Sequence, residues 1–202
     1  MDRRKQTGFT LYELLITVLV VAVILSFGIP NLRSFMLNSR ITGTANDLHA
    51  AFMLARTEAA RAKSSVTICA SADPWGAADC DGTWDQGYIV FVDEGADLER
   101  NDASEAVLRA HAPAATGVML RVADAATYFT YAPSGLGRPA GDEAPLSQVV
   151  ICDERGSDTA AGGNSAARLF IVTPLGRATI VRDQALIDAA LASPSMMGAT
   201  CP

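Results

Sequence analysis

The spacing of hydrophobic positions changes twice along the chain. Leu14–Leu32 is mostly apolar and uncharged throughout, and the next charged residue is Arg33. Phe9–Ile29 is about as long as a helix must be to cross a bilayer. Basic residues at positions 3–5 precede it, and such clusters stay on the cytoplasmic side. The pattern therefore predicts a membrane-spanning helix with the rest of the chain outside the cytoplasm.

After this run the apolar positions recur by alternating steps of four and three. The stripe consists of Ile41, Ala45, Leu48, Phe52, Ala55, Ala59 and Ala62. This spacing places them on one face of a helix, which then needs a partner on that side only. We predict one long helix over Phe9–Lys63, kinked near Gly28–Pro30 and loosened at Gly43. Its second half should pack on a sheet.

Beyond Lys63 the sequence changes to short β-branched or aromatic runs, mostly separated by Gly, Pro, Asp and Asn. The expected strands are Ser65–Ala70, Gly87–Asp93, Ala106–His111, Gly117–Ala123, Thr127–Ala132, Ser147–Asp153, Arg168–Thr173 and Arg177–Asp183. Several alternate between faces, as in a half-buried antiparallel sheet. Thr173–Ala178 is expected to form a hairpin turn, and Asp183–Ala192 a short helix or an irregular tail. The fold class is α+β.

Three interpretations of the N-terminal segment compete. A cleaved secretory signal should end in a small-x-small site, and the exit here offers only Ser26 and Gly28, with Pro30 close behind. A plain signal anchor fits the hydropathy but does not explain Glu13, because a carboxylate at the edge of an apolar span is costly. The third interpretation rests on the stretch GFTLYELL, Gly8–Leu15.

That stretch resembles the prepilin peptidase site of type IV pilins and type II secretion pseudopilins. In that family a short basic leader ends in Gly, and the cut falls before a Phe that becomes N-methylated. A Glu follows at the fifth mature position. The resemblance gives these roles to Gly8, Phe9 and Glu13, and gives Pro30 the role of a helix-kinking proline. Tyr12 replaces the aliphatic residue that usually precedes the Glu.

The resemblance implies a type IV pilin fold, a long N-terminal helix packed on a C-terminal antiparallel β-sheet domain. It divides the chain into a leader (1–8), a transmembrane and assembly half-helix (9–30), an amphipathic half-helix (31–63) and a periplasmic β-rich domain (64–202). The implied partners are other major and minor pilins, prepilin peptidase and the inner-membrane assembly platform. The chain would first span the inner membrane once, and would later join a pilus or pseudopilus fibre near its tip.

Electrostatics then accounts for Glu13. Cleavage leaves a new amine at Phe9, which remains positive after methylation. In a bundle of such helices, the carboxylate of one subunit can meet the amine of its neighbour. Opposite charges attract strongly in a low dielectric, and this offsets part of their desolvation cost. We therefore expect Glu13 to fix the axial register of the subunits.

Within the pilins, the chain is most similar to the GspH/FimT group of minor pilins and pseudopilins. Besides the N-terminus, the similarity rests on Ala45–Cys69, Gly82–His111 and Tyr128–Gly141. A Trp shortly before a strand ending in Phe-Val-Asp is typical of the group, and here it is Trp84. We expect a minor pilin that acts in pilus assembly, priming or a tip complex, and so in twitching motility, adhesion or DNA uptake. The alternatives are a type II secretion pseudopilin, a DNA-binding pilin for natural transformation, and an unrelated signal-anchored domain.

The four cysteines all lie after the apolar run and lack the CxxC or CxxH spacing of metal and thioredoxin-like sites. Outside the cytoplasm, two disulfides are the expected state, with free buried thiols as the alternative. The sequence allows three pairings. Cys69 and Cys80 bracket a loop rich in Ala, Asp and Gly, so we favour Cys69–Cys80. That leaves Cys152–Cys201 to hold the C-terminal tail.

The sequence offers no catalytic constellation. Its two histidines, His49 and His111, stand without a GxSxG, HExxH or P-loop pattern, so structural roles are expected for both. The acidic run Asp93–Asp102 lacks the ligand spacing and central Gly of an EF-hand, so we expect a solvated hairpin loop there. No enzyme activity, cofactor or metal is predicted.

Nucleic-acid binding would depend on arginines. DNA binding in some FimT-like pilins is tied to a C-terminal Gly-Arg-x-Arg motif, which the sequence GRATIVR matches only at Arg177, with Arg182 following later. Arg138 and Arg168 could join either of them. Without the leader the chain has 13 basic and 21 acidic side chains, and this balance opposes DNA. Exposed strand arginines are therefore favoured over a DNA site.

The first prediction concerns processing of the leader. Co-expression with a prepilin peptidase should remove residues 1–8 and leave Phe9 as the N-terminus, because GFTLYELL supplies the cut site. Intact-mass measurement of the purified chain checks this. A chain that keeps its leader, or that is cut near Ser26–Gly28, would contradict the prepilin interpretation.

Overall fold

The computed structural model describes residues 9–100, 105–140, 144–160, 162–196 and 201. It divides into two compact units, residues 1–39 and 40–202. We call the described part of the first unit the stem and the second unit the head. The long helix α1 (Leu11–Ala62) contributes to both and matches the predicted helix to within two residues at each end. The side chain of Pro30 lies outside the described residues, so the expected kink there stays a prediction.

The stem leaves its apolar side chains uncovered. Leu14, Leu19, Ile24 and Phe27 are all more than half exposed. By length and composition, α1 qualifies as a membrane-spanning helix. A helix that is hydrophobic all round must be buried in lipid or among other helices. The stem therefore lacks, within its own unit, the partner that its sequence demands.

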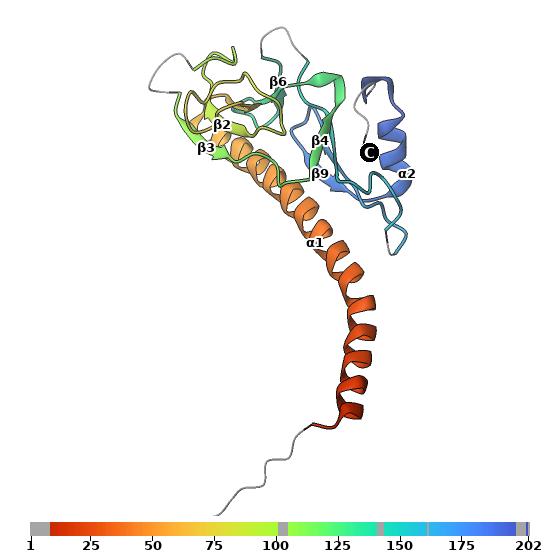
Figure 1. Cartoon of the computed structure of the whole chain (residues 1–202). Coiled ribbons are helices and arrows are strands. Elements are labelled where there is room, and N and C mark those ends of the chain that lie inside the picture. The colour runs from red at the N-terminus through yellow and green to blue at the C-terminus, as the bar shows by residue number, and fades with distance from the viewer. Residues whose placement is uncertain (1–8, 101–104, 141–143, 161, 197–200, 202) are drawn as a thin grey trace, which may run out of the picture. The chain divides into compact units, whose positions relative to one another are not determined.

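The strands of the head form two antiparallel sheets, where the sequence analysis expected one (Figure 1). The first has the order β3 (Val107–His111), β2 (Tyr88–Val92), β1 (Val66–Ala70), β5 (Tyr128–Tyr131) and β6 (Gly137–Arg138). The second has the order β4 (Met119–Val122), β7 (Gln148–Cys152), β8 (Arg168–Val172) and β9 (Ala178–Val181). Every predicted strand is confirmed, and among the strands of the described residues only the two-residue β6 was not foreseen.

Short helical turns complete the head. They are η1 (Ala123–Ala125), α2 (Gln184–Leu191) and η2 (Pro194–Met196). Asp183 caps α2, since its Oδ1 accepts the Leu186 N–H at 3.0 Å. The helix itself buries the side chains of Ile187 and Ala190. The segment expected as a short helix or a tail is thus a helix.

The second half of α1 packs through the predicted stripe. Its members from Ile41 to Ala59 are buried, whereas Ala62 is exposed at the helix end. The side chain of Phe52 is central. Its ring centroid lies 5.5 Å from that of Phe129 on β5 and 4.8 Å from that of Phe170 on β8. Phe52 therefore ties the helix to both sheets at once.

Asp93, the first residue of the acidic run, is fully buried, which differs from the solvated loop expected there. Its Oδ2 accepts the Thr67 hydroxyl at 2.6 Å, and its Oδ1 accepts the Asp97 N–H at 3.2 Å. Thr67 Oγ1 also lies 2.6 Å from Thr130 Oγ1. Burial raises the pKa of Asp93 above its ordinary value of 3.8, and the bonds from Thr67 and Asp97 oppose the rise. A strand-end carboxylate thus organises the start of the β2–β3 loop.

Replacement of Phe52 tests the packing. Phe52→Ala should lower the free energy of unfolding by about 3–5 kcal/mol, because it opens a cavity between two sheets and a helix. Met53→Ala, one residue along and 37% exposed, should cost less than about 1 kcal/mol. Urea unfolding of the detergent-solubilised chain, followed by tryptophan fluorescence, measures both. Equal costs would contradict the central role of Phe52.

Replacement of Asp93 tests the buried carboxylate. Because its folded pKa is raised, the stability it contributes is present at low pH and is lost as the pH rises from 3.8 through the folded pKa. Asn has nearly the same shape. It can accept the Asp97 N–H and donate to Thr67, which then donates to Thr130.

Asp93→Asn should therefore gain stability relative to the wild type as the pH rises over that range. Urea midpoints of both proteins across about pH 3 to 7 measure the difference. Asp79→Asn, at an exposed position, should run parallel to the wild type. A parallel curve for Asp93→Asn would show that the buried carboxylate does not titrate as described.

Candidate functional site

The start of α1 is a reciprocal cap between Thr10 and Glu13. Glu13 Oε2 accepts the Thr10 N–H at 2.9 Å and the Thr10 hydroxyl at 3.0 Å, and Thr10 Oγ1 accepts the Glu13 N–H at 3.2 Å. This Thr-x-x-Glu arrangement is a capping box, which satisfies amide groups at the helix end that would otherwise have no partner. The spacing was readable in the sequence, but the sequence analysis did not recognise it.

The cap engages only one oxygen of Glu13. Both hydrogen bonds go to Oε2, and within the described residues none goes to Oε1. Phe9 and Tyr12 beside it are exposed. Gly8 lies outside the described residues. The cap thus orients the carboxylate and leaves one acceptor oxygen for a group from outside the chain.

The cysteines form the two disulfides favoured from the sequence, Cys69–Cys80 and Cys152–Cys201, which close loops of 11 and 49 residues. The first joins the segment after β1 to that strand, and the second joins the C-terminal end of the chain to β7. In the chain-entropy model, such cross-links stabilise by about 3 and about 4 kcal/mol, respectively. Both therefore restrain segments that have little regular structure of their own.

Two hairpin turns, one from each sheet, dock on each other through glycines. The N–H of Gly137, the first residue of β6, donates to the carbonyl of Pro174, in the turn between β8 and β9, at 2.8 Å. A Cβ on Gly176, where φ is +73°, would lie 2.3 Å from the Gly135 carbonyl oxygen. The Tyr131 hydroxyl adds a bond of 3.1 Å to the Gly176 carbonyl. Only glycine permits so close an approach, so the two turns form one rigid unit.

The four candidate DNA-binding arginines do not form one surface. Arg138 and Arg177 are exposed on the docked turns, and Arg138 Nη1 donates to Ser65 Oγ at 3.1 Å. Arg182 is exposed at the opposite end of β9 from Arg177. Five steps along the strand separate these two by roughly 16 Å. The turns bring together two of the four.

The structure contradicts the prediction that Arg168 could contribute to a DNA-binding site. Its side chain is only 3% exposed and cannot contact DNA. Its Nη1 donates to three carbonyl groups, those of residues 165–167, at 2.8–3.2 Å. Nη2 lies 3.4 Å from Thr42 Oγ1 on α1. Burial lowers its pKa, and the charges of Arg182 and Arg155 lower it further. The side chain serves as a carbonyl cap that joins β8 to the helix.

The histidines have structural surroundings. The His111 ring stacks on Tyr88 at 4.5 Å between centroids, and its Nε2 lies 3.5 Å from the Asp47 carboxylate on α1. The Tyr88 hydroxyl is buried without a hydrogen-bond partner among the described residues, and burial raises its pKa. His49 is half-buried on α1. These contacts link β2 and β3 to the helix and do not arrange a nucleophile.

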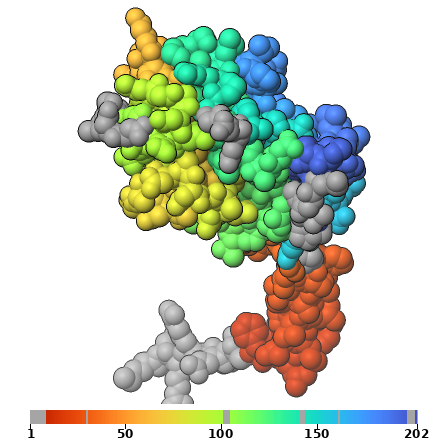
Figure 2. Space-filling view, turned by 90° about the horizontal axis from the view of Figure 1, so that it is seen from above, coloured from red at the N-terminus to blue at the C-terminus, as the bar shows by residue number. Residues whose placement is uncertain are grey.

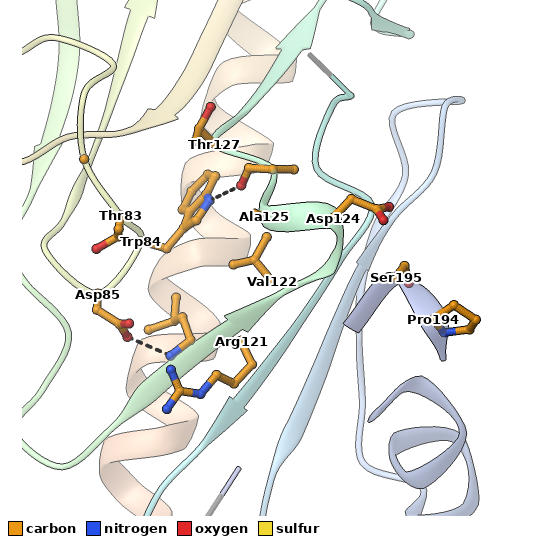
Figure 3. A pocket seen from close by; sticks show the side chains of 13 residues that line it. Thr83, Trp84, Asp85, Arg121, Val122, Asp124, Ala125, Thr127, Pro194 and Ser195 are labelled. Atoms are coloured by element: carbon orange, nitrogen blue, oxygen red, sulfur yellow. Dashed lines mark hydrogen bonds between the residues drawn. The ribbon is translucent and has the colours of Figure 1, made fainter. Parts of the chain in front are cut away.

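A cleft of about 590 Å³ lies beside β4 and η1 (Figure 3). Trp84 forms one wall, and its Nε1–H donates to the Ala126 carbonyl at 2.8 Å. The Asp85 carboxylate accepts a hydrogen bond from the Leu120 N–H at 2.8 Å through Oδ1. No His or Cys appears in the described lining, and within the described ranges no group of three His, Cys, Asp or Glu could hold a metal. The cleft holds no catalytic pair or metal site in this part of the chain.

Two solved structures similar to this chain are crystal forms of the type IV minor pilin FimU from Pseudomonas aeruginosa. The P21 form is 18% identical, with a TM-score of 0.48, and the match covers 73% of this chain and 92% of that one. The P65 form is 19% identical, with a TM-score of 0.47, and the match covers 69% and 91%. No curated protein matches the chain.

Two family models match the sequence. The model described as type II transport protein GspH matches residues 44–176, which is more than half of the chain. The model of the prokaryotic N-terminal methylation motif matches residues 3–29, the segment that holds Gly8, Phe9 and Glu13. The chain therefore belongs to the GspH family of type IV minor pilins and pseudopilins.

Proposed function

We propose that this protein is a minor type IV pilin that acts in pilus assembly, in priming or in the tip complex. The observation that carries the proposal is the stem. Its helix is apolar all round, its side chains are uncovered within its own unit, and its first turn presents a capped carboxylate with one oxygen unused. Such a helix suits a membrane before assembly and a bundle of like helices afterwards.

The proposed life of the chain begins as a prepilin. The leader, residues 1–8, stays in the cytoplasm, and the stem crosses the inner membrane with residues 64–202 in the periplasm. Prepilin peptidase cuts after Gly8, and Phe9 is methylated. The assembly platform then moves the chain into the fibre. The exposed arrangement of Phe9, one residue before the cap, supports access to this bond.

In the fibre, Glu13 Oε1 accepts the amine of Phe9 from a neighbouring subunit. The cap at Oε2 supports this role because it fixes the direction of the carboxylate before the neighbour arrives. A preoriented acceptor loses less freedom on binding than a mobile one. Pro30 is proposed to adjust the helix within the bundle.

A type II secretion pseudopilin is the second candidate, and the description of the matching family model favours it. An apolar stem of this kind would suit packing among helices in either a pilus or a secretion pseudopilus. Deletion of the gene separates the two. Loss of surface pili with normal secretion supports the pilin, and the reverse supports the pseudopilin. In both cases we propose a structural role, because the features described in the head are packing contacts and docked turns.

Substitution of Glu13 tests the charge pair. Glu13→Gln keeps an oxygen that can accept the Thr10 bonds but removes the charge. We expect its recovery in sheared fibres to fall about tenfold or more, because an unpaired amine left in an apolar bundle costs more than the ~1.4 kcal/mol that a factor of ten represents. Immunoblots of the fibre and membrane fractions measure the ratio.

Thr10→Ala is the matched control, since it removes the hydroxyl contacts of the cap and keeps the charge. It should reduce recovery less than Glu13→Gln does. Normal incorporation of Glu13→Gln or of Glu13→Ala would rule out the charge pair, and an equal loss in Thr10→Ala would assign the effect to the helix cap. Leader removal, measured in the same samples, separates assembly from processing.

A further inference from the structure

The docked turns carry exposed apolar and basic side chains together. Leu136 and Leu175 lie one on each turn, and their side chains are 44% and 69% exposed. Arg138 and Arg177 each follow a Leu-Gly pair, so that both turns carry the same Leu-Gly-Arg triplet. Arg56 of α1 lies over the first of these turns. We call these two leucines and three arginines the paired-turn surface.

The two turns, residues 132–136 and 173–177, have the same backbone. In each, the first residue donates its N–H to the carbonyl of the fifth, at 2.9 and 3.0 Å, and accepts the N–H of the fourth at 2.8 Å. The second residue is proline in both, and the fourth is a glycine, Gly135 or Gly176, with φ of +76° or +73°. Proline and the left-handed glycine fix this type of turn. The leucines therefore stand on a rigid backbone, which loses little freedom on binding.

The paired-turn surface is basic on an acidic protein. Residues 132–138 and 173–178 contain no carboxylate. No ion pair joins Arg56, Arg138 or Arg177 to an acidic group in the described ranges. A group of exposed carboxylates lies on other loops, 71–81 and 93–100, which form the adjoining yellow and lime areas of Figure 2. At physiological ionic strength a charge acts over about 8 Å, so the balance of the whole chain does not set the charge of this surface.

The two kinds of side chain together indicate what the surface binds. Guanidinium groups bind phosphates well, but the phosphates of a nucleic acid would leave the leucines in water. Protein interfaces are anchored mainly by Trp, Tyr and Arg, and neither turn carries an aromatic side chain. A bilayer with anionic lipids offers phosphates to the arginines and acyl chains to the leucines, and it needs no preformed pocket for protruding side chains.

We propose that the paired-turn surface binds a membrane surface that contains anionic phospholipids. Leu136 and Leu175 enter the boundary between headgroups and acyl chains, and the arginines contact the phosphates. The contact rests on the proposed tip position, because a head displayed at a fibre tip can reach a membrane other than the one that holds its stem. Two leucines and three arginines give one head a weak and reversible affinity. The surface therefore serves attachment.

Vesicle binding by the full chain tests the contact. The stem is first held in nanodiscs of neutral phosphatidylcholine, so that it does not insert into added vesicles. The discs are then sedimented with sucrose-loaded vesicles, made either of phosphatidylcholine alone or of an equimolar mixture with phosphatidylglycerol. We expect the partition coefficient to be about tenfold or more higher for the mixed vesicles, because each cation gains from the anionic surface. High salt should reduce it.

Serine substitutions test the insertion. Leu136→Ser with Leu175→Ser should lower the partition coefficient about tenfold, because the apolar groups that enter the bilayer are lost. Leu186→Ser, at a 52% exposed position of α2, is the matched control and should leave it unchanged. Urea midpoints equal to that of the wild type show that the fold is intact. If the double variant unfolds, Leu175→Ser alone, at the more exposed position, takes its place.

Glutamine substitutions test the charge. Arg138→Gln with Arg177→Gln should lower the partition coefficient about tenfold, because two of the three cations are removed. Arg182→Gln, at an exposed position outside the turns, should leave it unchanged. An environment-sensitive fluorescent amino acid in place of Leu175 should be quenched by nitroxide-labelled lipids in the mixed vesicles. The same probe in place of Leu186 should not be quenched.

Equal binding to neutral and mixed vesicles would overturn the proposal, as would an unquenched probe at position 175 or leucine variants that bind like the wild type. Duplex DNA that the chain binds as tightly as it binds the vesicles, with no effect of the leucine changes, would overturn it in favour of a nucleic acid. Sedimentation that requires an added host protein would also overturn it.

The nanodisc experiment does not depend on fibre assembly. A negative result therefore overturns the lipid contact alone and leaves the assembly role standing. Failure of the assembly role has a different signature, since the wild-type chain would then be absent from sheared fibres while the nanodisc-held chain still bound the mixed vesicles.

Discussion

The head depends on one packing interaction, the burial of a single face of α1 against two sheets. Phe52 lies between Phe129 of one sheet and Phe170 of the other, so the helix does more than cover a sheet. The sheets meet again at the docked glycine turns, and Arg168 of β8 also contacts Thr42 of the helix. Small alanines toward the helix end allow close contact there but bury little, so the large rings carry most of the apolar burial.

The two halves of α1 suit two different environments. In the head its apolar residues recur at helical spacing and face one partner. In the stem they surround the axis, and they are uncovered within their own unit. This change of pattern along one continuous helix separates the part that folds within the chain from the part that is completed by lipid or by other subunits. The first can be understood from one chain and the second cannot.

Local features were predictable from the sequence, and long-range pairings were not. The stripe from Ile41 to Ala59 and the strand runs depend on near neighbours, so periodicity located them. The split into two sheets depends on which distant strands meet, and no short window contains that information. Arg168 shows the same limit, because an arginine that begins a strand reads as exposed until three carbonyls are found around it.

The sequence also contained patterns that predict structure but that the sequence analysis did not use. The Thr-x-x-Glu spacing at Thr10 and Glu13 predicts a helix cap, and the repeated Leu-Gly-Arg triplet marked two turns with the same requirement for glycine. The Asp93 carboxylate reads as part of a charged loop, and only the sheet contacts place it in the interior. The disulfides were within reach because a short cysteine-bracketed loop suggested one bond and left two cysteines for the other.

The cap at the start of α1 has a consequence for the proposed removal of the leader. All of its donors and acceptors belong to Thr10 and Glu13, downstream of the bond between Gly8 and Phe9. In the proposed processing, hydrolysis of this bond leaves the first turn of the helix as it was. It removes three basic side chains and one acidic side chain and creates one ammonium group beside the turn. The proposed cleavage therefore changes the charge at the start of the helix and leaves the conformation of its first turn unchanged.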